Sequence, residues 1–188
     1  MEDRGPWKTI RMERVYASPW IEVDHHDVID PSGAPGTYGV VHFRNLAIGI
    51  LPLDQEMNTW IIGQYRYPVR KYSWEIPEGG GDRNVAPLES AARELREEAG
   101  IVAKEWTELL RMDLSNSASD EEAIIYLARD LEFHAPEPDS NEELMVRKLS
   151  FDALYAMVDS GEITDSLTVA AVLKARLWIL EGRIVPQK

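Results

Sequence analysis

The chain contains no cysteine, and only four of its 188 residues are histidine. The absence of cysteine excludes disulfides, thiolate nucleophiles and zinc–thiolate centres, so a bound metal must take oxygen or imidazole ligands. Two of the four histidines, His25 and His26, are adjacent. Because histidine is scarce, the composition favours carboxylates as metal ligands.

Positive charge and long apolar runs are also scarce. The chain has 20 basic and 33 acidic residues, which gives a formal net charge of −13. This balance argues against binding nucleic acid or anionic membranes through a general basic surface. The N-terminus MEDRGPWKTI lacks the apolar core of a signal peptide, and no run approaches the roughly 18 apolar residues of a membrane span. We therefore expect a cytoplasmic protein without nucleic-acid or membrane partners.

Aromatic and branched residues in rough alternation predict a mainly β structure for the first 70 residues. The expected strands cover residues 7–16, 20–29, 37–43, 45–53 and 59–67. The sequence DPSGAPG, residues 30–36, has the composition of a turn. Successive short strands joined by tight turns favour an antiparallel or mixed sheet over a doubly wound one.

The sequence WEIPEGGGDRN, residues 74–84, interrupts this pattern and is expected to form a loop. A helix should follow it, because Pro87 suits a first helical turn and Gly100 suits the left-handed position after the last turn. Later patterns predict strands at 106–115, 121–133 and 144–150 and closing helices at 151–161 and 165–182. One α+β domain is expected, with helices packed around a mixed sheet and the N-terminal strands as an accessory piece.

The expected helix carries an acidic face. On a helical wheel, an apolar arc that should be buried contains Leu88, Ala91, Ala92, Leu95 and Ala99. A separate arc contains Glu94, Glu97 and Glu98, whose like charges repel at this spacing. Oxygen ligands on one rigid element suit a hard divalent cation such as Mg²⁺, whereas the alternative is a solvated face with ordinary ion pairs. The glycine-rich stretch before the helix favours a metal site, because glycines let the backbone approach a ligand.

GGGDRNVAPLESAARELREEAGI resembles the Nudix box, which is a glycine, five residues, Glu, seven residues and R-E-aliphatic-x-E-E-x-G-aliphatic. The matching positions are Gly79, Arg93, Glu94, Leu95, Glu97, Glu98, Gly100 and Ile101. One position departs: Val85 stands where the box has its first Glu, and Asp82 is a partial substitute. The preceding GQYRYPV and WEIPEGG are similar to the ADP-ribose pyrophosphatase and nucleoside diphosphate sugar hydrolase branch of the superfamily.

The resemblance implies a metal site that holds Mg²⁺, with Mn²⁺ as a substitute. Glu94 and Glu98 match its principal ligands, and Glu97 matches a further ligand or one that binds through water. In this branch the residue before the box glycine, here Glu78, gives its backbone carbonyl. Arg93 matches a structural residue that braces the helix against the loop by pairing with a carboxylate.

The resemblance also assigns residues outside the box. The branch has its general base in a later loop, where Glu142 aligns best and Glu143 is the rival. Arg66 matches a position that contacts substrate phosphates, and the alternative is a strand-edge arginine paired with one of the many acids. The implied architecture is the Nudix fold, a mixed sheet between helices (α/β/α). Residues 1–40 would be N-terminal strands that help form a homodimer, and residues 41–188 the Nudix hydrolase domain.

The implied activity is Mg²⁺-dependent hydrolysis of the pyrophosphate bond of ADP-ribose or of a nucleoside diphosphate sugar such as GDP-mannose. The products would be a nucleoside monophosphate and a sugar phosphate. An alternative within the family is hydrolysis of nucleoside triphosphates or dinucleoside polyphosphates. A second alternative is a Nudix module that binds a nucleotide sugar without turnover, which Val85 alone favours.

Overall fold

The computed structural model describes residues 2–136 and 143–186. The chain divides into two compact units. Unit 1 contains Met1–Leu46 and Asp113–Glu122, and unit 2 contains Ala47–Met112 and Ala123–Lys188. The expected boundary between residues 40 and 41, and the separate role of the N-terminal part, stay predictions.

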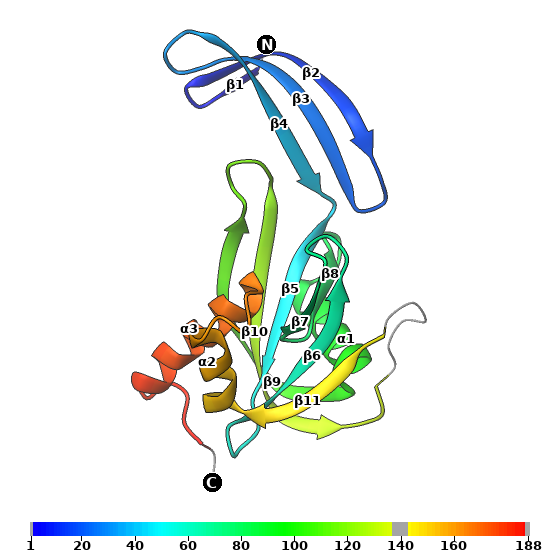
Figure 1. Ribbon diagram of the computed structural model, residues 1–188, viewed down its shortest axis with the longest axis vertical. Helices are drawn as coiled ribbons and strands as arrows, with labels where there is room; N and C mark the ends of the chain where they lie inside the picture. The colour runs from blue at the N-terminus through cyan, green and yellow to red at the C-terminus, as the bar shows by residue number, and fades with distance from the viewer. Residues whose placement is uncertain (1, 137–142, 187–188) are drawn as a thin grey trace. The chain divides into compact units, whose positions relative to one another are not determined.

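Unit 1 is built on an antiparallel sheet with the strand order β1-β2-β3-β4 (Figure 1). The strands are β1 (Glu2–Arg4), β2 (Trp7–Ala17), β3 (Ile21–Ile29) and β4 (Pro35–Phe43). The expected turn at 30–36 joins β3 to β4, and the Asp30 carboxylate stabilises it by accepting hydrogen bonds from the backbone N–H groups of Ser32 and Ala34. Asp113–Glu122 joins this unit through a bridge from Ser119 to Val41 and a hydrogen bond from the Tyr38 hydroxyl to the Ser117 carbonyl.

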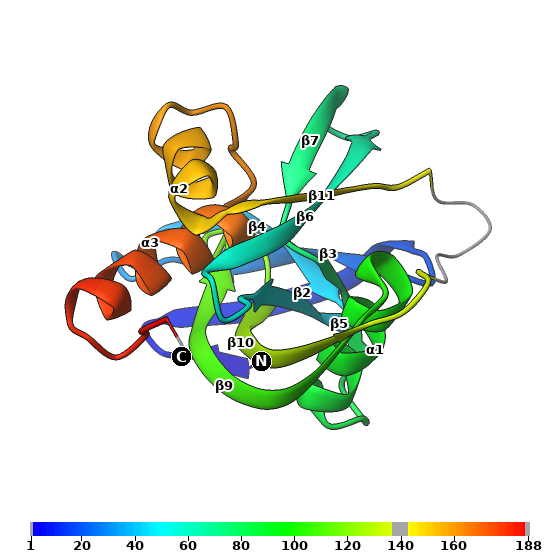
Figure 2. The same ribbon diagram turned by 90° about the horizontal axis from the view of Figure 1, so that it is seen from below.

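Unit 2 contains two sheets. The first has the order β8-β5-β10-β9, from β8 (Glu78–Asp82), β5 (Asn45–Pro52), β10 (Glu121–Phe133) and β9 (Ile101–Leu114). β5 and β10 are parallel, and their pairing runs from Ala47 with Ala123 to Pro52 with Ala128. The second sheet is antiparallel, with β6 (Asn58–Arg66) between β11 (Met145–Ser150) and β7 (Lys71–Glu75), and Figure 2 shows β11 beside β6. These sheets confirm the expected α+β class with a mixed sheet and N-terminal antiparallel strands.

Three helices complete the described part of unit 2: α1 (Pro87–Ala99), α2 (Phe151–Asp159) and α3 (Ser166–Leu180). α1 packs on β8 and β6, whereas α2 packs on β11, β6 and α3. The Ser150 side chain caps α2 by accepting from the Ala153 N–H, and the Asp165 side chain caps α3 in the same way from Thr168. No helix in residues 2–136 or 143–186 is long and apolar enough to cross a lipid bilayer.

The strands at the core of unit 2 carry consecutive apolar residues rather than alternating apolar and polar ones. This pattern is expected for strands that are covered on both faces. The largest fully buried side chains are Ile48, Ile50, Leu51, Leu53, Ile61, Ile62, Ile76, Leu95, Ile101, Ile124, Ile125 and Phe151. Burying one such side chain contributes about 1.5–3 kcal/mol relative to leaving it in water. The core therefore holds the sheets and α1 together, and α1 carries the acidic residues.

Two expectations about local structure were wrong. The stretch 74–84 is not a loop throughout, because it contains the end of β7 and all of β8. The strand expected from residue 106 begins at Ile101, directly after the helix. β8 has the sequence EGGGD, which carries little intrinsic strand preference, and it forms because β5 pairs with it.

Candidate active site

Helix α1 begins and ends where the sequence predicted. Pro87 occupies the start of the first turn, where its missing N–H removes no hydrogen bond. Gly100 takes a left-handed conformation with φ 66° and ψ 28°, and its N–H donates to the Arg96 carbonyl at 2.9 Å. A Cβ at Gly100 would also overlap the carbonyl oxygen of His134. Both the backbone conformation and the available space therefore require glycine at this position.

The buried face of α1 agrees only in part with the helical wheel, which correctly placed Ala91, Leu95 and Ala99 inside. Leu88 is 39% exposed and Ala92 is exposed, whereas Glu94 is only 9% exposed and Glu98 only 5%. The cause is the partner strand β8, whose glycines let α1 approach closely. A Cβ at Gly79 would overlap the Glu94 carboxyl group. The two acids that match principal metal ligands are thus directed into the structure and not into solvent.

The contacts of the helix acids tie α1 to β8. A Glu98 carboxylate oxygen accepts a hydrogen bond from the Glu78 backbone N–H at 2.9 Å. Arg93 donates to Glu94 at 2.6 Å, to Glu97 at 2.8 Å and to the Gly80 carbonyl at 3.2 Å. Arg93 therefore braces the helix against the glycine strand, which is the role that the resemblance implied. The Glu97 side chain is 36% exposed and lies nearer to solvent than Glu94.

The donor chemistry of this region fits a hard divalent cation. Glu94 and Glu98 are carboxylates on one helix, they are largely withdrawn from water, and the Glu78 backbone lies against Glu98. Buried carboxylates are costly unless they are paired, and a divalent cation is a suitable partner for oxygen ligands. The acidic residues here could hold such a metal.

A second acidic group lies next to these residues and was not predicted. Ligand atoms of Glu75, Glu78 and Asp165 lie within 4.8 Å of one another. Arg66 bridges two of them: its Nε donates to both oxygens of Glu75 at 3.0 Å, and its Nη2 donates to Glu75 and Glu78 at 2.7 Å each. The Glu75 side chain is 2% exposed and that of Arg66 is 37% exposed. Arg66 is the cation of this group.

Burial and the charges of this group shift the pKa values of Arg66 and Glu78. Burial works against the charge on Arg66, but the hydrogen bond with Glu75 and the charges of Glu78 and Glu75 more than offset it, so the guanidinium pKa is raised. Burial, followed by the charges of Asp165 and Glu75, raises the pKa of Glu78 well above its usual range, although Arg66 opposes this. The second oxygen of Glu78 is buried and has no hydrogen-bond partner among the described residues. The charged form of Glu78 is thus disfavoured in this group.

Asp165 enters the group through the start of α3. Its carboxylate accepts hydrogen bonds from the Thr168 N–H and hydroxyl, both at 2.8 Å. The Thr168 hydroxyl oxygen in turn accepts from the Ile76 N–H at 2.9 Å. This chain fixes the first turn of α3 against the segment between β7 and β8. The Asp-Ser-Leu-Thr sequence at 165–168 signals a helix cap, but no sequence feature signalled that the cap would meet Glu75.

The structure describes some of the remaining predicted residues but not all of them. Glu142 lies outside the described residues, and Glu143 is exposed. Val85, which departs from the box, is 39% exposed. Asp82, considered as its substitute, accepts hydrogen bonds from the backbone and side chain of Asn84 at 2.8 and 2.9 Å.

Comparisons with known proteins identify the family of the chain. The model of the NUDIX domain matches residues 43–168, and the model of the nucleoside diphosphate sugar hydrolase N-terminal domain matches residues 7–41. The chain belongs to the Nudix family. It is a Nudix pyrophosphohydrolase with the Nudix fold, as the sequence predicted.

Relatives cover most of the chain. An ADP-ribose pyrophosphatase of Mycobacterium tuberculosis is 33% identical over 171 residues, which cover 89% of this chain and 82% of the relative. An ADP-ribose pyrophosphatase of Bacillus subtilis is 28% identical over 167 residues, which cover 88% and 90%. The crystal structure of an ADP compounds hydrolase matches with a TM-score of 0.85 at 22% identity and covers 98% of this chain and all of that one. At this identity the structural likeness supports the fold alone.

Proposed function

We propose that this Nudix pyrophosphohydrolase hydrolyses the pyrophosphate bond of ADP-ribose, or of a nucleoside diphosphate sugar such as GDP-mannose, in the presence of Mg²⁺. The products are a nucleoside monophosphate and a sugar phosphate. The observation that carries the proposal is the pair of largely buried carboxylates, Glu94 and Glu98, packed against the glycine strand β8. The names of the two bacterial relatives support ADP-ribose as the first substrate to test.

In this proposal Glu94 and Glu98 are the principal ligands of Mg²⁺, Glu97 assists them, and Glu78 contributes its backbone carbonyl. The Glu78 N–H already holds Glu98 in place at 2.9 Å, and Arg93 holds both Glu94 and Glu97. When bound, the cation supplies an activated water and charge stabilisation for the phosphates. The protein orients these carboxylates in advance, so little reorganisation is needed when substrate arrives.

The proton of the attacking water requires an acceptor, and we assign it to Glu142, with Glu143 as the rival. Glu142→Gln should lower the rate and leave metal affinity nearly unchanged. The matched variant Glu143→Gln should then have little effect. The reverse pattern would move the role to Glu143, and unchanged rates in both variants would refute a base in this segment.

We also assign Arg66 to a substrate phosphate. Its Nε and Nη2 donate to Glu75 and Glu78, which fixes the plane of the guanidinium group. The Nη1 hydrogens are the ones that we assign to the phosphate, since a guanidinium has five donors in a rigid arrangement. The Glu75 and Glu78 pairs would thus position Arg66 rather than occupy it fully.

A substrate panel tests the proposal against its alternatives. The purified chain would be incubated in Mg²⁺ with ADP-ribose, GDP-mannose, a nucleoside triphosphate and a dinucleoside polyphosphate, and the products identified. We expect AMP and ribose 5-phosphate from ADP-ribose, and GMP and mannose 1-phosphate from GDP-mannose. Preferential cleavage of the triphosphate or dinucleoside polyphosphate would support the alternative substrate classes. Calorimetric binding of a nucleotide sugar with no turnover in Mg²⁺ or Mn²⁺ would support a binding module.

We further propose that the chain acts as a homodimer through the strands of unit 1. β2 and the turn that follows it expose Ile10 by 50%, Met12 by 56%, Val15 by 58%, Tyr16 by 54% and Trp20 by 71%. Such a concentration of exposed apolar side chains in one sheet is typical of a protein–protein interface. A second copy of the same sheet would cover it symmetrically.

A further inference from the structure

Unit 1 contains a cluster of polar side chains that the proposed catalytic site does not use. Ligand atoms of Asp24, His26 and His42 all lie within 4.8 Å of one another. Asp24 and His26 are two residues apart on β3 and therefore point to the same face of the sheet. On β4, His42 pairs with Glu22 and Val40 pairs with Asp24, which places His42 on that face too. The pairing register of β3 and β4 thus creates the cluster.

The cluster is withdrawn from solvent. Asp24 and His26 are each 2% exposed, and the His42 side chain is 27% exposed. Arg14 donates hydrogen bonds to both carboxylate oxygens of Asp24, and the imidazoles of His26 and His42 lie beside this carboxylate.

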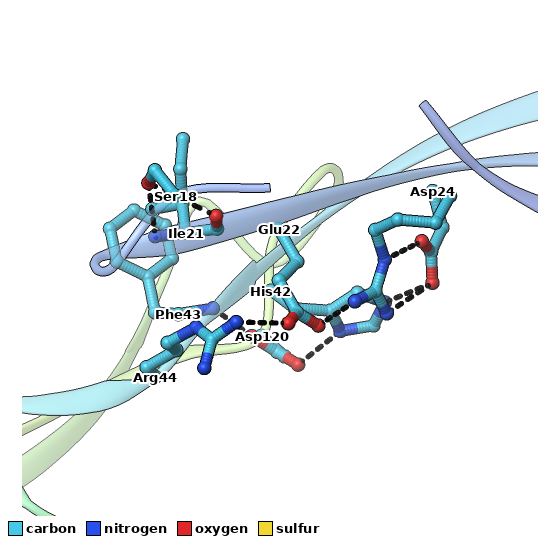
Figure 3. Close-up of polar contacts among 9 residues, drawn as sticks. Ser18, Ile21, Glu22, Asp24, His42, Phe43, Arg44 and Asp120 are labelled. Atoms are coloured by element: carbon cyan, nitrogen blue, oxygen red, sulfur yellow. Dashed lines mark hydrogen bonds and ion pairs between the residues drawn. The ribbon is translucent and has the colours of Figure 1, made fainter. Parts of the chain in front are cut away.

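His42 has the geometry of a polarised metal ligand. Its Nδ1 lies 2.6 Å from a carboxylate oxygen of Asp120, and its Nε2 lies 3.3 Å from Oδ2 of Asp24 (Figure 3). A carboxylate on one ring nitrogen fixes the tautomer and makes the other nitrogen a better donor to a metal. Two donors at about 2.0–2.1 Å from a tetrahedral zinc ion are separated by about 3.3–3.4 Å. The His42–Asp24 separation matches this value.

Nearby charges leave room for a cation. Arg14 binds both oxygens of Asp24, and it and Arg44 also pair with Glu22. An ionised carboxylate offers about four acceptor positions, so Oδ2 can bind Arg14 and a metal together. The ion pairs around the cluster join three acids, Glu22, Asp24 and Asp120, to Arg14, Arg44 and His42.

We propose that Asp24, His26 and His42 form a second metal site, separate from the catalytic acids of unit 2 and specific for zinc or a similar borderline divalent ion. Two imidazoles and one carboxylate suit zinc, whereas Mg²⁺ prefers an all-oxygen set. The site ties β3 to β4 and, through Asp120, to the segment Asp113–Glu122 of the same unit. Its role is to stabilise unit 1, and it does not depend on the proposed hydrolase activity.

Zinc titration of the chelator-treated full chain tests this site. The parent is Glu98→Gln, so that the catalytic acids compete less for zinc. We expect one zinc per chain, and binding weakened by about 100-fold or more in His42→Gln and by about 10–100-fold in Asp120→Asn, whose carboxylate only orients His42. His25→Gln is the matched control for His26→Gln, because His25 is adjacent but 46% exposed and contacts Asp27 instead. The control should bind zinc as the parent does.

Two further measurements separate a metal site from a structural effect. Co²⁺ added to the parent should give the intense visible absorption of a tetrahedral ion, and His42→Gln should lose it while its circular dichroism stays that of the parent. Zinc should raise the melting temperature of the parent but not of His42→Gln. Equal zinc affinity in the parent, His42→Gln and Asp24→Asn would overturn the proposal, and so would an equal loss in His25→Gln.

Discussion

The two units each contain a close group of three ionisable side chains around an arginine. In unit 1, Asp24, His26 and His42 gather beside Arg14, and in unit 2, Glu75, Glu78 and Asp165 gather around Arg66.

The donor atoms distinguish the two groups. The unit 1 group offers two imidazoles and one carboxylate and suits a borderline metal, whereas the unit 2 group offers carboxylate oxygens alone. Proximity of acids is therefore a poor guide to a metal site by itself. In unit 2 we assign the hard cation to the neighbouring pair Glu94 and Glu98, and Arg66 compensates the closer group.

The largest effect should come from removing a proposed ligand of the hard cation. Glu98→Gln keeps the hydrogen bond acceptor for the Glu78 N–H but removes the charge. Loss of about 3–5 kcal/mol of transition-state stabilisation corresponds to a rate lower by about 10²–10⁴-fold. Steady-state kinetics with ADP-ribose and Mg²⁺ measure it, and circular dichroism checks the fold. A rate near that of the wild type would refute the ligand assignment.

Arg66→Met should lower stability as well as affinity for substrate, because it leaves the buried Glu75 without its cation and removes the group that we assign to a substrate phosphate. We expect a loss of about 2–4 kcal/mol in the free energy of unfolding, below the full cost of breaking a buried pair since the Arg66 side chain is 37% exposed. Arg111→Met is the matched control, because the Arg111–Glu108 pair is exposed on both sides and should contribute under about 1 kcal/mol. Urea unfolding measures both. Equal losses would mean that Arg66 is an ordinary surface arginine.

Gly79→Ala probes the contact between β8 and the proposed ligand Glu94. The new methyl group would overlap the Glu94 carboxyl group, which is the end of a flexible side chain and can move. We expect retained fold and a rate at subsaturating Mg²⁺ lower by about 10–100-fold, as for other changes that displace a metal ligand. Gly39→Ala is the control, since nothing lies within 4 Å of its added Cβ. If the rate of Gly79→Ala depended on Mg²⁺ as that of the wild type does, Glu94 would not be a ligand of the metal.

Replacing exposed apolar side chains of unit 1 should have the smallest effect on the rate of hydrolysis. Light scattering should give twice the chain mass for the wild type. Val15→Glu should weaken the dimer about tenfold or more, because it places a charge in the proposed interface. Val185→Glu, at a residue 53% exposed in unit 2, should leave the dimer intact. A monomeric wild type would rule out the dimer.

Much of the fold could be predicted because its signals are local. Alternation predicted β2, β3 and β4 of unit 1 but not the short β1, and Pro87 and Gly100 fixed the ends of α1. β8 was missed because three glycines give no strand signal, and pairing with β5 forms the strand. The buried face of α1 was wrong at Leu88 and Ala92 for the same reason, since the glycine strand determines which face of α1 can approach it.

The residues of the candidate site likewise include some that the sequence could predict and some that it could not. Glu94, Glu97 and Glu98 are close in sequence, and their spacing and their resemblance to a known motif were enough to predict them as candidates. Glu75 and Asp165 are far apart in sequence, and the cap of α3 brings them together. Asp24 and His42 likewise meet only through the register of β3 and β4. Contacts of this kind depend on pairing and packing that the sequence pattern does not specify.

The most direct measurement is the rate of ADP-ribose hydrolysis by the chelator-treated wild-type chain as Mg²⁺ is added back. We expect the rate to rise from background to saturation, with AMP and ribose 5-phosphate released in equal amounts. Full activity without any divalent cation would contradict it. Failure to hydrolyse ADP-ribose or any other diphosphate compound at every Mg²⁺ concentration would contradict it as well.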